Sequence, residues 1–239
     1  MDQTAKVYDA KTGKKLLVLK GHTGRVWSAQ FSLDGNRIVT ASEDTTAKVW
    51  DGNTGKEIFS INGHTNNGVS TAKFSPDGNR IVTASQDNTA KVWDAIKVGK
   101  ELISLEGHTS GVTSAQFSSD GKRIITASVD NTAKVWDADT GKELLSLKGH
   151  TGLVQSAQFS PDGSRIVTAS WDNIAKVWDA KTGAELLSFK GHTGWVLSGQ
   201  FSPDGNRIVT TSEDKTTKVW DARPYAESFA EREAAEAKR

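Results

Sequence analysis

The sequence predicts an all-β protein made of five similar units, each folding as an antiparallel sheet of four short strands. A Gly-His pair recurs every 42 to 44 residues, a Trp-Asp pair follows each one at a nearly fixed distance, and no helical period of 3.6 residues appears before residue 223. The Gly-His pairs are Gly21-His22, Gly63-His64, Gly107-His108, Gly149-His150 and Gly191-His192. The Trp-Asp pairs are Trp50-Asp51, Trp93-Asp94, Trp136-Asp137, Trp178-Asp179 and Trp220-Asp221.

The first unit shows why each unit predicts four strands. Short runs rich in Val, Ile, Thr and aromatic residues occupy residues 26–31, 36–42, 46–51 and 56–61. Turn-forming residues separate these runs, and the first turn contains Asp34-Gly35, which supplies the positive φ of a tight hairpin. We therefore expect a four-stranded meander that is repeated along the chain.

These motifs resemble the WD-repeat family, and the resemblance covers nearly the whole chain. It implies a β-propeller of about five blades, and such near-identical units resemble those of bacterial WD-repeat proteins. The propeller is predicted over residues 1–222, with a half unit at 1–20 and units at 21–62, 63–106, 107–148, 149–190 and 191–222. Residues 223–239 are predicted to form a short helix, because Ala and Glu dominate there and Pro224 is suited to a helix start.

The two ends of the chain are incomplete units. Residues 4–20 match the third and fourth strands of a unit, with Tyr8-Asp9 in place of Trp-Asp, whereas the last unit stops after its third strand. The segment around Leu16 to Leu19 could complete the last unit and close a ring of five blades, which we favour. The third strand is then present twice, so a spare strand, an open ring and closure between two chains by strand exchange remain alternatives.

The histidines are predicted to be structural. Each shares its unit with a Thr, an Asp and a Trp at repeating offsets, and an indole, a hydroxyl, an imidazole and a carboxylate can satisfy one another when buried. The family resemblance implies a buried hydrogen-bonded chain at these positions. The network residues are His22, Thr40, Asp44, Trp50, His64, Thr83, Asp87, Trp93, His108, Thr126, Asp130, Trp136, His150, Thr168, Asp172, Trp178, His192, Thr210, Asp214 and Trp220.

The positions that differ between units indicate a binding surface. All three tryptophans outside the framework fall at such positions, and the resemblance places these positions on the upper face around the central channel. The predicted partner-binding residues are Arg25, Trp27, Glu43, Gln86, Val129, Leu153, Gln155, Trp171, Trp195, Leu197 and Glu213. Covering of the channel mouth, contact with the tail and contact with a second copy are the alternative roles of these residues.

Composition narrows the classes of function. The chain has 30 Lys and Arg against 29 Asp and Glu, so we expect neither nucleic-acid nor membrane binding. It has no Cys and no nucleophile elbow or phosphate loop, so no cofactor, metal or catalytic residue is predicted. We expect a non-enzymatic scaffold that binds a protein or peptide and resides in the cytoplasm. A self-assembling array that forms homo-oligomers through ring closure and, less favoured, a channel-site hydrolase that uses Glu43 or Glu213 are the alternatives.

Overall fold

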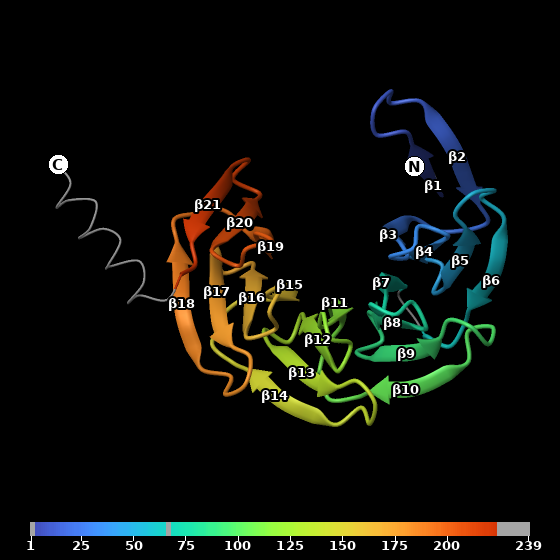
Figure 1. Ribbon diagram of the computed structural model, residues 1–239. Coiled ribbons are helices and arrows are strands. Elements are labelled where there is room, and N and C mark those ends of the chain that lie inside the picture. The colour runs from blue at the N-terminus through green and yellow to red at the C-terminus, as the bar shows by residue number, and fades with distance from the viewer. Residues whose placement is uncertain (1–2, 66–67, 224–239) are drawn as a thin grey trace.

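The structure is a computed structural model that describes residues 3–65 and 68–223. In these residues, 21 strands form six antiparallel sheets that follow one another around an arc (Figure 1). The prediction of an all-β chain of repeated four-stranded antiparallel sheets is confirmed. We call the sheets that begin at β3, β7, β11, β15 and β19 blades 1 to 5, and the sheet of β1 and β2 the N-terminal half-blade.

Each blade is a meander whose first strand lies innermost (Figure 1). The half-blade contains β1 (Thr4–Tyr8) and β2 (Lys15–Lys20). Blade 1 contains β3 (Val26–Phe31), β4 (Arg37–Ser42), β5 (Ala47–Asp51) and β6 (Glu57–Ile61), and blade 2 contains β7 (Val69–Phe74), β8 (Arg80–Ser85), β9 (Ala90–Asp94) and β10 (Glu101–Leu105). Blade 3 contains β11 (Val112–Phe117), β12 (Arg123–Ser128), β13 (Ala133–Asp137) and β14 (Glu143–Leu147), and blade 4 contains β15 (Val154–Phe159), β16 (Arg165–Ser170), β17 (Ile174–Asp179) and β18 (Glu185–Lys190). Blade 5 contains β19 (Val196–Phe201), β20 (Arg207–Ser212) and β21 (Thr217–Asp221).

The hydrophobic core lies between neighbouring blades. Val39 and Val49 of blade 1 pack with Phe74, Ile81 and other apolar residues of blade 2 in one buried cluster. Equivalent clusters join blade 2 to blade 3 and blade 3 to blade 4. Since the second and third strands of each inner blade are covered by neighbours on both sides, their burial is nearly continuous rather than alternating.

The ends of the arc differ from the favoured closed ring. The segment from Leu16 to Leu19 lies in β2 and pairs with β1, with Leu17 opposite Val7, so it does not complete blade 5. Leu19 is buried with Ile38 and Trp50 of blade 1, which holds β2 at the N-terminal end of the arc. In the described part of the chain, blade 5 therefore has three strands, and an opening separates it from the half-blade (Figure 1).

The predicted C-terminal helix cannot be compared with the structure. Residues 224–239 lie outside the described residues. The last described residue, Arg223, donates hydrogen bonds to the carboxylate of Asp221.

Candidate functional site

The four network side chains of blade 1 form one chain of hydrogen bonds. Trp50 Nε1 donates to Thr40 Oγ1 at 2.8 Å, Thr40 Oγ1 lies 2.7 Å from His22 Nε2, and His22 Nδ1 lies 2.8 Å from Asp44 Oδ2. Among the described residues, the other acceptor near the Thr40 hydroxyl is the Lys48 carbonyl oxygen, at the longer distance of 3.5 Å. The hydroxyl therefore donates to Nε2, which places the proton of a neutral imidazole on Nδ1, where it is donated to Asp44.

The same atoms make the same contacts in the other four blades. The Trp–Thr, Thr–His and His–Asp distances all lie between 2.7 and 2.8 Å. The chains consist of His64, Thr83, Asp87 and Trp93; His108, Thr126, Asp130 and Trp136; His150, Thr168, Asp172 and Trp178; and His192, Thr210, Asp214 and Trp220. Both ring nitrogens of every histidine are thus engaged within the protein.

Electrostatics favour the same protonation states. Burial lowers the pKa of His22, His64 and His108, because the loss of hydration outweighs the attraction of the neighbouring aspartates. Burial alone would raise the pKa of Asp44, but hydrogen bonds from Thr46, the Thr23 amide and His22 outweigh it and lower this pKa to about 2. At neutral pH the network therefore joins a neutral imidazole to an ionised carboxylate, which suits a structural link.

Blade 4 departs from the repeat at one position. In the other blades a Thr hydroxyl donates to the network carboxylate, as Thr46 does to Asp44 at 2.6 Å. Ile174 takes this place in blade 4, and only its backbone amide donates to Asp172, at 3.0 Å. The carboxylate of Asp172 therefore has one side-chain donor fewer than its counterparts.

We call the end of the channel that is lined by the turns between the second and third strands of the blades the upper mouth. A cavity of about 580 Å³ opens there. Eight of the eleven predicted binding residues line it: Trp27, Glu43, Gln86, Val129, Leu153, Gln155, Trp171 and Leu197. They come from the inner strands and from the turns between the second and third strands of several blades. The structure thus brings together side chains that lie up to 170 residues apart in the sequence (27 to 197).

Three predicted binding residues do not line this cavity. Arg25 lies over the ring of Trp27, with its guanidinium carbon 5.3 Å from the ring centroid. Trp195 stacks on Trp171 with the ring centroids 3.7 Å apart and the planes 4° apart. Glu213 is exposed on blade 5. Arg25 and Trp195 therefore support residues of the cavity, whereas Glu213 lies apart from it.

The prediction missed several hydroxyl groups in the same cavity. Adjacent residues line it in pairs, as Thr113 with Ser114 and Gln155 with Ser156 do. The pairing register shifts between Val112 and Ser114, and equivalently in the other blades, so two consecutive side chains face the channel. The prediction selected positions that differ between units, whereas this position carries Ser or Thr in every unit, which is why Ser114 and Ser156 were not predicted.

Some polar atoms of this cavity have no protein partner. The hydroxyl oxygens of Ser114 and Ser156 and the indole Nε1 of Trp171 are closed off from solvent and make no hydrogen bond to the described residues. Buried polar atoms of this kind normally have a partner, from the protein, from water or from a ligand. The upper mouth therefore combines apolar walls with unused hydrogen-bonding groups.

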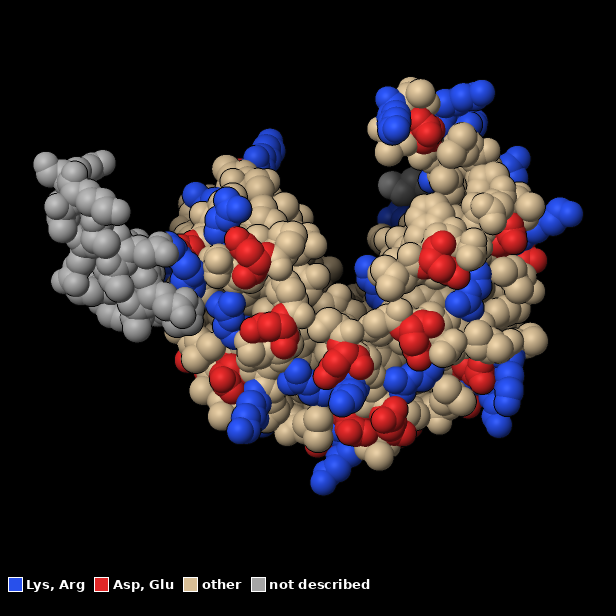
Figure 2. Space-filling view, viewed as in Figure 1, with Lys and Arg blue, Asp and Glu red and all other residues tan. Residues whose placement is uncertain are grey.

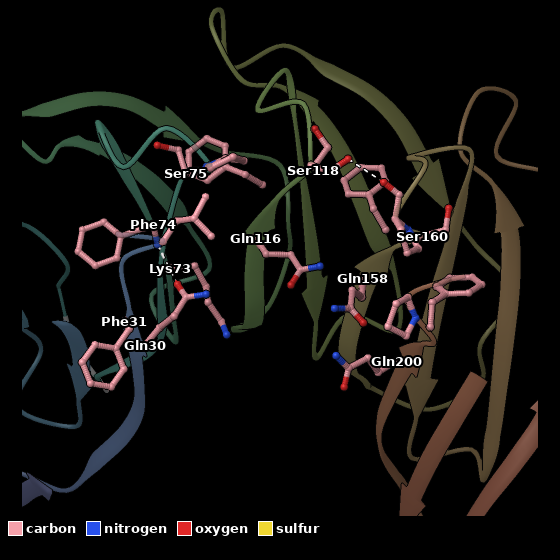
Figure 3. A pocket seen from close by; sticks show the side chains of 18 residues that line it. Gln30, Phe31, Lys73, Phe74, Ser75, Gln116, Ser118, Gln158, Ser160 and Gln200 are labelled. Atoms are coloured by element: carbon pink, nitrogen blue, oxygen red, sulfur yellow. Dashed lines mark hydrogen bonds between the residues drawn. The ribbon is translucent and has the colours of Figure 1, made fainter. Parts of the chain in front are cut away.

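The opposite mouth of the channel has a different chemistry. A cavity of about 570 Å³ is lined by Gln30, Lys73, Gln116, Gln158 and Gln200, with phenylalanines and serines behind them (Figure 3). Lys73 stands where the other blades carry Gln, and burial lowers its pKa. Gln30 already accepts a hydrogen bond from the Phe74 amide at 3.0 Å. This mouth therefore combines glutamines and one lysine with phenylalanine rings, and its lining contains none of the tryptophans of the upper mouth.

Other site classes find little support in the described residues. Within 3–65 and 68–223, no group of three or more His, Asp or Glu side chains is placed to hold a metal ion. No helix in these ranges is long and apolar enough to cross a membrane. On the face seen in Figure 2, basic and acidic side chains alternate along the arc and do not gather in a patch of one sign.

The repeats also match a known family model. The model described as WD domain, G-beta repeat matches five times, at residues 13–51, 55–94, 99–137, 141–179 and 183–221. The chain belongs to the WD40 family. Each WD40 match begins at the outermost strand of one sheet and ends at the third strand of the next, as residues 13–51 run from β2 to β5.

WD40 membership establishes a general class of role. WD40 repeats are generally scaffolds for interactions with proteins or peptides, and proteins of this family are typically non-enzymatic. A search of curated proteins found no match to this chain. The partner and the face it binds are therefore argued from the site.

Proposed function

We propose that this WD40 protein is a non-enzymatic scaffold that binds a protein or peptide segment at the upper mouth of its channel. The combination of apolar walls and polar side chains in the lining of the upper cavity carries this proposal. A second feature supports it, because Trp and Arg are the residues most often found at interface hot spots, and Trp27, Trp171, Trp195 and Arg25 gather at this mouth.

The cavity fits an extended apolar segment. Leu153, Trp171 and Leu197 form an apolar wall on one side, and Trp27 contributes to the lining from blade 1. The side-chain amides of Gln86 and Gln155 in the lining can bind the backbone of such a segment, which gives specificity that apolar contact alone lacks. Glu43, also in the lining, favours a basic group on the adjoining part of the partner.

The same geometry argues against a hydrolytic role. Glu43 lines the cavity, whereas Glu213 does not. Hydrolysis by paired carboxylates requires two acids that face one bond.

In the proposed scaffold, the hydrogen-bonded networks fix the turns that carry Glu43, Gln86, Val129 and Trp171, so little ordering entropy is lost on binding.

The proposal is tested by selecting short peptides from a random display library on the purified protein and measuring the dissociation constant of the best binder. Trp171→Ala should weaken this binding by at least about tenfold, equivalent to ~1.4 kcal/mol. Leu144→Ala is the matched control, because Leu144 is an exposed apolar residue on the outer strand β14. Its affinity should equal that of the unmodified protein.

A second variant tests whether unfolding, rather than loss of the site, explains a loss of peptide binding. Val129→Asp places a charge on the rim of the same cavity without removing a stacked ring, and it should also abolish binding. Melting curves of both variants are recorded alongside. Binding that survives both substitutions in folded protein would refute the upper mouth as the site.

A further inference from the structure

The opposite mouth of the channel carries one lysine in a row of glutamines. The fifth residue of each blade's first strand lines this mouth, and these residues are Gln30, Lys73, Gln116, Gln158 and Gln200. In Figure 3 the side chains of Lys73, Gln116 and Gln158 extend into the cavity from three successive blades. Blade 2 therefore places a positive charge where its neighbours place an uncharged amide.

This lysine replaces a group that links neighbouring blades. In blade 1, Gln30 accepts a hydrogen bond from the Phe74 amide of blade 2 at 3.0 Å. Lys73 has the same place in blade 2, but an ammonium group has no acceptor and cannot make this bond to Phe117 of blade 3. Blade 2 thus gives up a structural hydrogen bond and brings a charge into the lining, and such a charge is costly without a partner.

The ammonium of Lys73 has no partner in the part of the chain that the structure describes. The lysines of the third strands differ in this respect, because each pairs with a glutamate; they are Lys48, Lys91, Lys134 and Lys176. Burial lowers the pKa of Lys73, and no neighbouring acid opposes this effect. An anion that enters the cavity would supply the missing partner.

The arginines behind this mouth are already engaged. The guanidinium carbon of Arg37 lies 5.1 Å from the centroid of the Phe74 ring, and its nitrogens donate to the carbonyl oxygens of Gly78 and Ala95 in the next blade. The same contact joins the following blades through Arg80, Arg123 and Arg165. These arginines hold the blades together, whereas Lys73 lies in the lining itself.

The acid that follows Lys73 in the sequence is also engaged. Asp77, in the exposed turn after β7, accepts hydrogen bonds from the Ser75 hydroxyl and from Asn79. The aspartates of the equivalent turns make similar contacts, as Asp120 does with Ser118. Lys73 is therefore the charged residue in the lining of this cavity.

We propose that the opposite mouth is a second binding site, which takes the carboxylate of an Asp or Glu side chain in a segment of a partner protein. In this site the Lys73 ammonium pairs with the carboxylate, and the side-chain amides of Gln116 and Gln158 donate to its oxygens. The phenylalanine and proline rings of the lining contact apolar groups beside the acid. The three polar residues belong to blades 2, 3 and 4, so the site does not involve either end of the arc.

The charge and the walls of the cavity favour a carboxylate over a phosphate group. One ammonium matches the single charge of a carboxylate, whereas a phosphate group carries a charge of about −1.5 to −2 at neutral pH. The other polar groups of the lining are uncharged amides and hydroxyls, and phenylalanine and proline rings complete it. An acidic residue with apolar neighbours in a protein segment therefore fits this cavity.

The site is tested by binding the purified protein to an array of all peptides of the form acetyl-Xaa-Glu-Zaa-amide, with the corresponding Gln peptides beside them. The tightest Glu peptide and its Gln counterpart are then compared by isothermal titration calorimetry. The Glu peptide should bind at least about tenfold more tightly, because only the carboxylate forms charge-assisted hydrogen bonds with Lys73.

Lys73→Gln should abolish this preference for Glu. The other four blades carry Gln at this position, so the variant should fold and melt at or above the temperature of the unmodified protein. Lys142→Gln is the matched control, because it makes the same change at an exposed lysine in a turn of blade 3. It should keep the full preference for Glu.

Three results would overturn the inference. They are an array in which no Glu peptide binds more tightly than its Gln counterpart, a preference for Glu that survives Lys73→Gln, and inorganic phosphate that binds as tightly as the Glu peptide. Trp171→Ala should leave binding of the Glu peptide unchanged, and Lys73→Gln should leave binding of the display-selected peptide unchanged. A failure of this inference is therefore distinguishable from a failure of the proposed function.

Discussion

The eight tryptophans serve two purposes that their surroundings separate. Five donate from the indole to a buried threonine and join the strands of their own blade. The other three lie at the upper face, where Trp27 is 53% and Trp195 is 39% exposed and Trp171 lies beneath Trp195. The sequence separated the two groups because the framework tryptophans recur with the repeat. It could not show the stack, which depends on how blades 4 and 5 meet.

At the same scale, we predict that the buried histidines lower the free energy of unfolding in acid. The pKa values of His22, His64 and His108 lie below the ordinary 6.5 in the folded protein, so the unfolded chain binds more protons as pH falls through that value. The free energy of unfolding should therefore be highest above pH 6.5 and fall between about pH 7 and about pH 5, where histidine is the side chain that titrates. Urea unfolding at a series of pH values measures this dependence.

Removal of one histidine provides the control for this pH dependence. His108→Gln should lower stability at neutral pH, because its threonine and aspartate partners lose a well-placed group. It should also make the pH dependence shallower, because one titrating group is lost. A free energy of unfolding that stays constant from about pH 7 to about pH 5 would contradict a neutral imidazole in the network.

At the scale of the strand and turn, one backbone position distinguishes the blades. The residue after each network Asp has a positive φ of 65 to 73°, a conformation that Asn tolerates better than other side chains. Blades 2, 3 and 4 carry Asn88, Asn131 and Asn173 there, whereas blade 1 carries the β-branched Thr45. The turn itself was predictable from the sequence, but its left-handed residue was not singled out.

A reciprocal exchange tests this strain. Thr45→Asn should stabilise the protein by about 1 kcal/mol, which raises the melting temperature by about 2–4 °C in a chain of this size. Asn131→Thr should lower it by a similar amount. Equal melting temperatures for both variants and the unmodified protein would show that the turn stores no strain at this position.

The inner strands show where sequence patterns stop being sufficient. Comparison of the units selected Gln155 because its position differs between blades, but the register shift near the start of β11 and β15 turns Ser114 and Ser156 toward the channel as well. A bulge depends on pairing with the neighbouring strand, and similar residues occur at regular strand positions elsewhere. The place of Ser114 and Ser156 in the lining was therefore visible only in the structure.

At the scale of the whole molecule, local patterns predicted the blades but not the closure of the ring. The order of strands within each sheet follows from short turns and alternating residues, and it agrees with the prediction. Closure depends on the angle between successive sheets, which the packing of Val39, Val49 and Phe74 and of their counterparts sets. The repeated contact of Arg37 with the next blade keeps that angle constant, and the described residues form an open arc.

Hydrogen–deuterium exchange with and without the selected peptide tests the central claim most directly, because it locates the binding face without altering any residue. The proposed scaffold predicts slower exchange in the first residues of β7, β11 and β15 and in the turns that carry Glu43, Gln86 and Trp171. Exchange around Gln116, Gln158 and the other residues of the opposite mouth should not change. Protection confined to that opposite mouth or to the outer strands would contradict a binding site on the upper face.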